Sequence, residues 1–164
     1  MSEILPLSRL VYRGKKPFIF VSYPHKYNEK NNNIINDIVR LFYSNYYRIW
    51  NDAGCDDGRP YDVVLDEKLS DCACMIAFIS SETNSSDDCK IELETARGLH
   101  KPIIIVKMED DFQMGYILRK LLFGLSLFEF SKFNAPEALV SVLCTQTMLD
   151  ECRDTERLEE LRNS

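Results

Sequence analysis

The chain has 164 residues, of which 45% are hydrophobic and 28% charged, with a formal net charge of −6 and an isoelectric point near 5.0. This size and balance predict one globular domain with a sizeable core. Lysine and arginine are spread along the chain, which argues against a nucleic-acid partner. The sequence shows neither an apolar stretch of membrane-spanning length nor the pattern of a secretory signal. We therefore expect a cytoplasmic protein without a membrane partner.

The six cysteines are too sparse for a disulfide-stapled secreted domain, and we expect reduced thiols. Cys72 and Cys74 have the two-residue spacing that places side chains on one face of a strand. No second Cys or His pair accompanies them at zinc-site spacing, so core packing is favoured and no metal is expected.

A leader and a first strand–helix unit open the chain. Residues 1–16 carry scattered apolar side chains that are too irregular to predict an element. Phe18 to Tyr23, "FIFVSY", is a run of β-branched and aromatic residues that predicts a buried strand. Apolar residues at helical spacing then predict a helix over about 29–45. Tyr46 to Trp50 is again strand-like and leads into a turn-rich segment ending at Pro60.

The second half alternates in the same way. A short helix is expected over about 61–69, followed by a continuous apolar strand from Cys72 to Ser80, of the kind that is buried on both faces. Ser85-Ser86-Asp87-Asp88 predicts a helix start with a hydroxyl N-cap, and this helix should end near Gly98. "KPIIIVKM" predicts a fourth strand and Leu125–Phe130 a fifth. Pro136 opens a helix through about Thr145, and the charged residues from Asp150 extend it as a helical tail.

Alternating strands and helices with long connections predict a doubly wound parallel α/β sheet of five strands. The two most apolar strands, Cys72–Ser80 and "PIIIV", should be central and buried. Ligands of such sheets bind beyond the carboxyl ends of the strands. The segments that should carry chemistry are therefore Ser22–Lys26, Asn51–Pro60 and Ser81–Glu92.

Three sequence blocks occur in an order and spacing that resemble the TIR family. They are "PFIFVSYPHK", "RIWNDAGCDDG" and "AFISSETNSSDDCKIELETA". The first is similar to the family's F-[IV]-S-Y box and the second to its BB loop. In the third, Ser86, Cys89 and Glu92 match an S-x-x-C-x-x-E segment. The resemblance covers about 17–146, and it is closest to the stand-alone bacterial type.

This resemblance implies a flavodoxin-like five-stranded parallel sheet with strand order 2-1-3-4-5. It divides the chain into a leader (1–16), a TIR domain (17–146) and a C-terminal helical tail (147–164). The sequence departs from the family's pattern at Asp88, where many TIR enzymes have Trp and bacterial relatives often have Asn. It departs again at Pro24-His25, where a basic pair is common, and at Asp56 and Asp57, which make the loop unusually acidic.

The family has two activities, and the resemblance implies one or the other: cleavage of the nicotinamide–ribose bond of NAD+, or non-catalytic scaffolding through TIR–TIR association. Nicotinamide leaves an N-glycosyl pyridinium as a neutral molecule, so one carboxylate that stabilises the developing cation suffices. NAD+ is then a substrate, and no cofactor is required. We expect the enzyme, in bacterial anti-phage or stress signalling, with a possible downstream effector that senses its nucleotide product.

Glu92 is the predicted catalytic residue, although a solvated helix-face carboxylate is the ordinary alternative. The predicted substrate-binding residues are Ser22, Tyr23, His25, Trp50, Asp52, Ser86 and Cys89. Trp50 has a competing interpretation as a core aromatic residue, and Trp50 or Tyr23 could stack on the pyridinium. Asp52, Gly54, Asp57 and Gly58 belong to the predicted self-association loop.

Two other α/β classes fit less well. Gly54 and Gly58 lack G-x-G-x-x-G spacing and do not follow the first strand, which excludes a Rossmann dehydrogenase. A two-component receiver would resemble its family only with acidic residues after the first strand, where Ser22 stands. His25 and His100 are far apart in the sequence and suggest no nucleophile–histidine constellation, and His100 should lie on the surface at a helix C-terminus.

Overall fold

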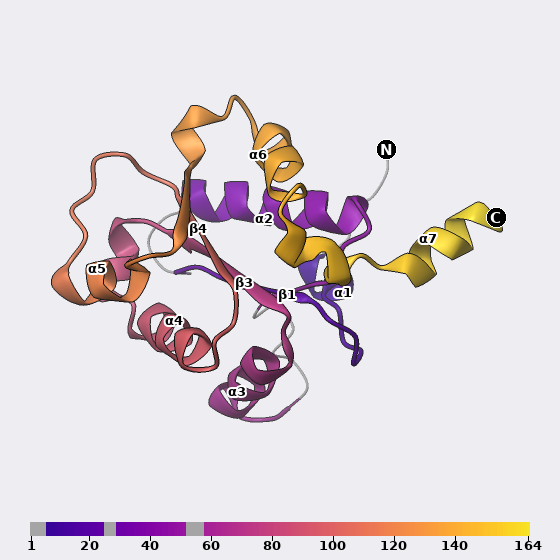
Figure 1. Cartoon of the computed structure of the whole chain (residues 1–164), viewed down its shortest axis with the longest axis horizontal. Coiled ribbons are helices and arrows are strands. Elements are labelled where there is room, and N and C mark those ends of the chain that lie inside the picture. Colours follow the sequence, from indigo (N-terminus) through magenta and orange to yellow (C-terminus); the bar gives the residue numbers. More distant parts are fainter. Residues whose placement is uncertain (1–5, 25–28, 52–57) are drawn as a thin grey trace.

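The computed structural model describes residues 6–24, 29–51 and 58–164, and Figure 1 shows a sheet covered by helices on both faces. The strands are β1 (Ile19–Ser22), β2 (Ile49–Trp50), β3 (Cys74–Ile79), β4 (Ile103–Lys107) and β5 (Ser126–Glu129). All neighbours pair in parallel, in the order β2-β1-β3-β4-β5. The predicted fold class and strand order are confirmed, and β3 is the buried central strand.

The helices follow the strands. They are α1 (Leu7–Leu10), α2 (Glu29–Ser44), α3 (Tyr61–Asp71), α4 (Asp87–Gly98), α5 (Tyr116–Leu122), α6 (Pro136–Leu143) and α7 (Thr155–Arg162), with 3₁₀ turns η2 (Ser81–Ser85), η3 (Phe130–Lys132) and η4 (Thr147–Cys152). In the part of the chain that the structure describes, no helix is both long enough and apolar enough to cross a bilayer.

Side chains of the strands alternate between two apolar layers. Ile19 and Val21 of β1 face the layer under α2 and α6, whereas Phe18 and Phe20 face the layer under α3 and α4. Figure 1 shows these two pairs of helices on opposite sides of the sheet. The alternation puts Ser22, the last residue of β1, on the α3/α4 side.

The leader and the tail both reach the core. Val11 is buried against Phe18 and Trp50, and the backbone N–H of Tyr12 donates to the carbonyl of Ile49 at 2.9 Å. Leu149 and Cys152 of η4 are fully buried. In contrast, α7 extends away from the rest of the molecule (Figure 1) and has no buried residue. The division into leader, domain and tail stays a prediction.

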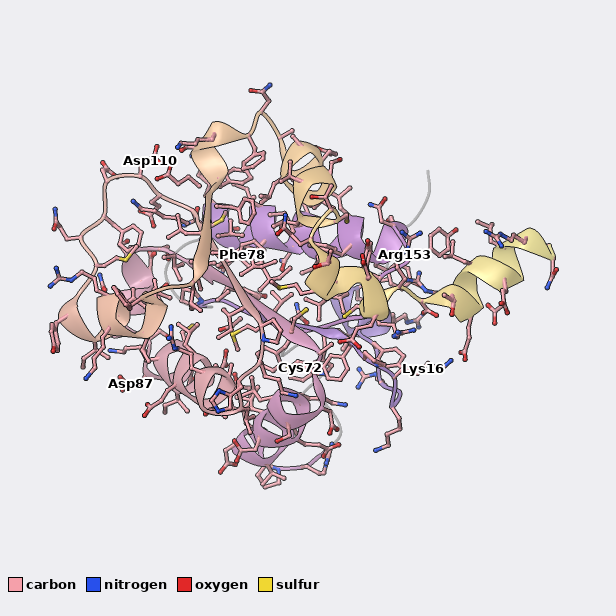
Figure 2. All side chains as sticks on the ribbon, viewed as in Figure 1. Lys16, Cys72, Phe78, Asp87, Asp110 and Arg153 are labelled. Atoms are coloured by element: carbon pink, nitrogen blue, oxygen red, sulfur yellow. The ribbon has the colours of Figure 1, made fainter. Side chains whose placement is uncertain are left out.

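Two predictions about the elements differ from the structure. β2 is only two residues long because Tyr46 adopts a left-handed backbone (φ 65°) and Tyr47 forms an isolated bridge with Arg153. The prediction that Cys72 and Cys74 share a strand face is wrong. Cys72 is the C-cap of α3, at the junction before β3 (Figure 2), and contacts the α3/α4 layer, whereas Cys74 faces the α2/α6 layer. Both thiols are nevertheless buried in the core, as expected.

Candidate active site

A pocket of about 330 Å³ opens beyond the carboxyl ends of β1 and β3, where a doubly wound sheet binds ligands. Its described lining comes from the end of β1, the start of α3, η2 and the first turns of α4. The lining residues are Tyr23, Pro24, Tyr61, Glu82, Ser85, Ser86, Asp87, Asp88, Cys89 and Glu92. Its volume lies at the small end of the range for ligand pockets.

Glu92 is the most buried carboxylate of this pocket. It lies in the second turn of α4, and only 7% of the residue is exposed. The Ser22 hydroxyl at the end of β1 donates a hydrogen bond of 2.5 Å to Oε2 of Glu92. The ordinary alternative, a solvated helix-face carboxylate, is therefore excluded, because Glu92 points inward to the sheet rather than to solvent.

The first turn of α4 is built by Ser86 and Cys89. Ser86 is the N-cap, and its hydroxyl accepts from the backbone N–H of Cys89 at 3.3 Å, which confirms the predicted hydroxyl cap. The Cys89 thiol is in hydrogen-bond contact with the hydroxyls of Ser86 and Ser22. Burial raises the pKa of this thiol to about 12, and the negative charge of Glu92 adds to the rise. Cys89 is therefore a neutral thiol at physiological pH and no nucleophile.

A second glutamate of the pocket, Glu82, lies in η2, the 3₁₀ turn that precedes α4. The Ser80 hydroxyl, just beyond β3, donates to Oε2 of Glu82 at 2.7 Å. The backbone N–H of Ser80 donates to the Thr83 hydroxyl at 2.9 Å, which closes a capping box on η2. η2 is tied further to the loop before α5, because Asn84 bonds the backbone of Gln113 and Gly115. This rim of the pocket is thus held by side-chain bonds on both sides.

The described lining of the pocket is acidic. Glu82, Asp87, Asp88 and Glu92 are its charged members, and no Lys or Arg is among the described lining residues. Asp87 and Asp88 are exposed at the first turn of α4, where Asp87 lies at the periphery of the molecule (Figure 2). The nearest cation along α4, Lys90, is held by the carbonyl of Asn84 at 2.8 Å. The field in this pocket favours a cation over an anion.

The structure brings together five of the predicted site residues. Tyr23, Ser86, Cys89 and Glu92 line the pocket, and Ser22 lies directly behind Glu92. Trp50 is elsewhere: it is 1% exposed and packs on Phe20, with ring centroids 5.1 Å apart, inside the core. His25 and the loop residues Asp52, Gly54 and Asp57 lie outside the described residues. His100 is exposed just past the C-terminus of α4, as predicted.

Sequence reasoning missed Glu82 and Tyr61 as members of the pocket. Glu82 falls within a segment that was expected to carry chemistry, and its signal is its position three residues after the end of β3. Tyr61 is the first residue of α3 and follows the turn-rich segment directly. In the described ranges, no group of three or more His, Cys, Asp or Glu side chains is arranged to hold a metal ion.

A larger hollow, of about 710 Å³, lies between α4 and α5. Its walls include the exposed apolar side chains of Ile91, Tyr116 and Ile117. It lies on the outer side of the helices and does not border a strand end. The smaller pocket is the better candidate active site because it contains the buried carboxylate and the two strand-end serines lie beside it.

Comparisons with known proteins agree with this fold. A family model described as "TIR domain" matches residues 19–140. The TIR domains of the activated Roq1 resistosome, which recognises the pathogen effector XopQ, superpose with a TM-score of 0.53 at 14% identity, covering 89% of this chain and 78% of that one. The Clostridium botulinum CMP N-glycosidase BcmB gives a TM-score of 0.51 at 16% identity, covering 77% and 97%. No curated protein matches the sequence.

Proposed function

This chain belongs to the TIR domain family, and we propose that it cleaves the bond between nicotinamide and ribose in NAD+. The observation that carries the proposal is Glu92, a buried carboxylate that lines an acidic pocket at the strand ends. A non-catalytic adaptor has no use for a carboxylate held in this way. Burial of a charged group costs free energy, and buried charged groups are found most often at functional sites, where the charge takes part in the reaction.

The proposed reaction needs one negative charge close to the sugar. The bond between C1′ of ribose and N1 of nicotinamide breaks, and its electron pair leaves with nicotinamide, whose ring nitrogen becomes neutral. C1′ takes on the positive charge, which the carboxylate of Glu92 stabilises. Water then bonds to C1′ and releases a proton, so the products are nicotinamide, ADP-ribose and H⁺. Attack by another nucleophile in place of water gives a cyclic or conjugated product.

The acidic lining supports binding of the leaving group, the cationic nicotinamide ring. Glu82 and Asp88 add to the negative field of Glu92, whereas Asp87 is paired with Lys90 at 3.8 Å. This field attracts the pyridinium ring before cleavage. The base of CMP is neutral, whereas the nicotinamide ring of NAD+ is positively charged. Both substrates also carry negative phosphate groups, for which the described lining offers no Lys or Arg. The similar structure of the CMP N-glycosidase is consistent with an N-glycosidic bond as the target, and the acidic lining favours NAD+ over CMP.

The wider role that we propose follows from the same family. The chain acts in the cytoplasm, self-associates through its TIR domain, and releases a nucleotide product that a downstream effector senses in anti-phage or stress signalling. The similar resistosome structure contains TIR domains in an assembly, which supports self-association as part of this proposal.

The test is nicotinamide release from NAD+ by the wild type and by Glu92→Gln. The substitution keeps the size of the side chain and removes its charge, so we expect turnover to fall by roughly 100- to 1000-fold. Glu94→Gln is the matched control. Glu94 is exposed on the same helix and points about 200° away from Glu92, so that variant should retain wild-type turnover.

Three outcomes would count against the proposal. If Glu92→Gln releases nicotinamide as fast as the wild type, the catalytic assignment is wrong. If the wild type releases cytosine from CMP and no nicotinamide from NAD+, the substrate is wrong. If assembled wild-type protein cleaves neither, the adaptor alternative replaces the enzyme.

A further inference from the structure

Ser22 lies behind Glu92 and not on the wall of the pocket. It is the last residue of β1 and is buried. It does not belong to the described lining of the pocket. Its hydroxyl nevertheless makes the 2.5 Å bond to Oε2 of Glu92. A residue that bound the ribose directly would have to present its hydroxyl to the pocket. The sequence-based expectation of a substrate-binding role therefore needs revision.

Resting on the proposed function, we propose that Ser22 is a positioning residue, which fixes the carboxylate of Glu92 through Oε2. A hydroxyl has one proton to donate, and a carboxylate only accepts, so the direction of this bond is set. One short charge-assisted bond to Oε2 restricts rotation of the carboxylate plane. Because Ser22 pairs with Ala77 of β3 in the parallel ladder, the backbone of the donor is held by the sheet.

Cys89 supports this arrangement from the same helix face as Glu92, three residues earlier. The Ser22 oxygen keeps two lone pairs after donating its proton, and the thiol of Cys89 is within hydrogen-bond contact of it. Ser22 therefore lies between Cys89 and Glu92, and its one proton is given to Oε2 of Glu92. Ser86 in turn bonds the backbone N–H of Cys89.

The bond is made to the ionised form of Glu92, so its loss should disfavour that form. The charged and titratable groups around Glu92 come from three elements and the end of β1. They are Tyr23 after β1, Tyr61 on α3, Glu82 on η2, and Asp87, Asp88 and Cys89 on α4. The neighbouring carboxylates disfavour the ionised form of Glu92 by charge repulsion. The hydrogen bond from the Ser22 hydroxyl favours the ionised form and so acts against this repulsion.

The experiment replaces Ser22 with Ala and follows two readouts. In NAD+ cleavage, kcat should fall by up to about 100-fold, as for a displaced catalytic group, while KM stays within about twofold. The acid limb of the kcat profile should move to higher pH, and Ser22→Thr, which keeps the hydroxyl, should restore it. In the free protein, the ¹³C titration midpoint of the labelled Glu92 carboxyl should rise in Ser22→Ala relative to wild type.

Ser80→Ala is the matched control for the titration. Ser80 is equally buried and stands at the end of the neighbouring strand, but its hydroxyl bonds Glu82, so the Glu92 titration should stay at its wild-type midpoint. Cys72→Ala, which changes a buried thiol outside the described lining of the pocket, should also leave that midpoint unchanged.

An unchanged Glu92 titration in Ser22→Ala overturns the proposal, and so does a raised KM with unchanged kcat, because that result would make Ser22 a substrate-binding residue. The titration is measured without NAD+. It therefore tests the positioning role even if the wild type cleaves no NAD+, so the failure of the two proposals can be told apart.

Discussion

At the scale of single residues, burial sets which thiols ionise. Desolvation raises the pKa of Cys72 to about 11 and that of Cys89 to about 12. In the unfolded chain both thiols return to ordinary values near 9. Between pH 9 and 11 the folded protein therefore binds more protons than the unfolded chain, and the free energy of unfolding falls as pH rises. The contribution is fully present below pH 9.

Cys72→Ala should remove one part of this pH dependence. Its thiol donates to the carbonyl of Leu69 at 3.2 Å, at the end of α3 and far from solvent. Urea unfolding of the wild type and the variant at several values between pH 9 and 11 should give curves whose slopes against pH differ by at most about 1.4 kcal/mol per unit. Parallel slopes would show that the folded thiol titrates like an exposed one.

At the scale of elements, the leader is a part of the core. Val11 is 6% exposed and packs in one core cluster with Phe18 and Trp50, although residues 1–16 show no periodic pattern that would predict this. Val11→Ala should lower the free energy of unfolding by about 2 kcal/mol, from lost apolar contact and the cavity left behind. Val63→Ala is the same change at a side chain 48% exposed on α3, and it should stay within about 0.5 kcal/mol of wild type. Equal losses from the two, measured by urea unfolding, would contradict core packing of the leader.

Elements with a clear local pattern of apolar residues could be predicted from the sequence. Elements whose bounds depend on tertiary contacts could not. β3 and β4 were predictable because continuous apolar runs suit strands buried on both faces. The length of β2 depends on the left-handed backbone of Tyr46 and on the bridge from Tyr47 to Arg153, more than 100 residues away. α5 was missed because "YILRKLL" is only seven residues long, too short for the periodicity to indicate a helix.

At the scale of the whole molecule, the site was predictable where topology alone places residues together. The parallel order brings the ends of β1 and β3 side by side, and so the segments around Ser22 and Glu92 meet. The burial of Glu92 and the donor role of Ser22 were not predictable, because both depend on the position of α4 relative to the strand ends. Trp50 has the large aromatic side chain that stacking on a substrate ring requires. Its place in the short strand β2 nevertheless keeps the ring in the core.

Self-association should depend on the loop from Asp52 to Pro60, of which Asp52, Gly54 and Asp57 lie outside the described residues. Gly58 has a left-handed backbone (φ 85°), and no heavy atom of the described residues lies within 4 Å of where its Cβ would be. Gly58→Leu therefore adds a side chain that projects into open space, where a partner would meet it. We expect a loss of the assembled species in light scattering, together with a loss of nicotinamide release.

The control for this prediction is Gly124→Leu. Gly124 has nearly the same backbone (φ 81°) and the same open surroundings, but it lies between α5 and β5. Both substitutions bear a similar strain of about 1–2 kcal/mol, since a left-handed backbone is unfavourable for any residue with a Cβ. A difference between the variants therefore reports on contact between molecules and not on folding. If Gly58→Leu assembles and turns over NAD+ as the wild type does, the loop is not the contact; if only Gly124→Leu dissociates, the contact lies beside α5 instead.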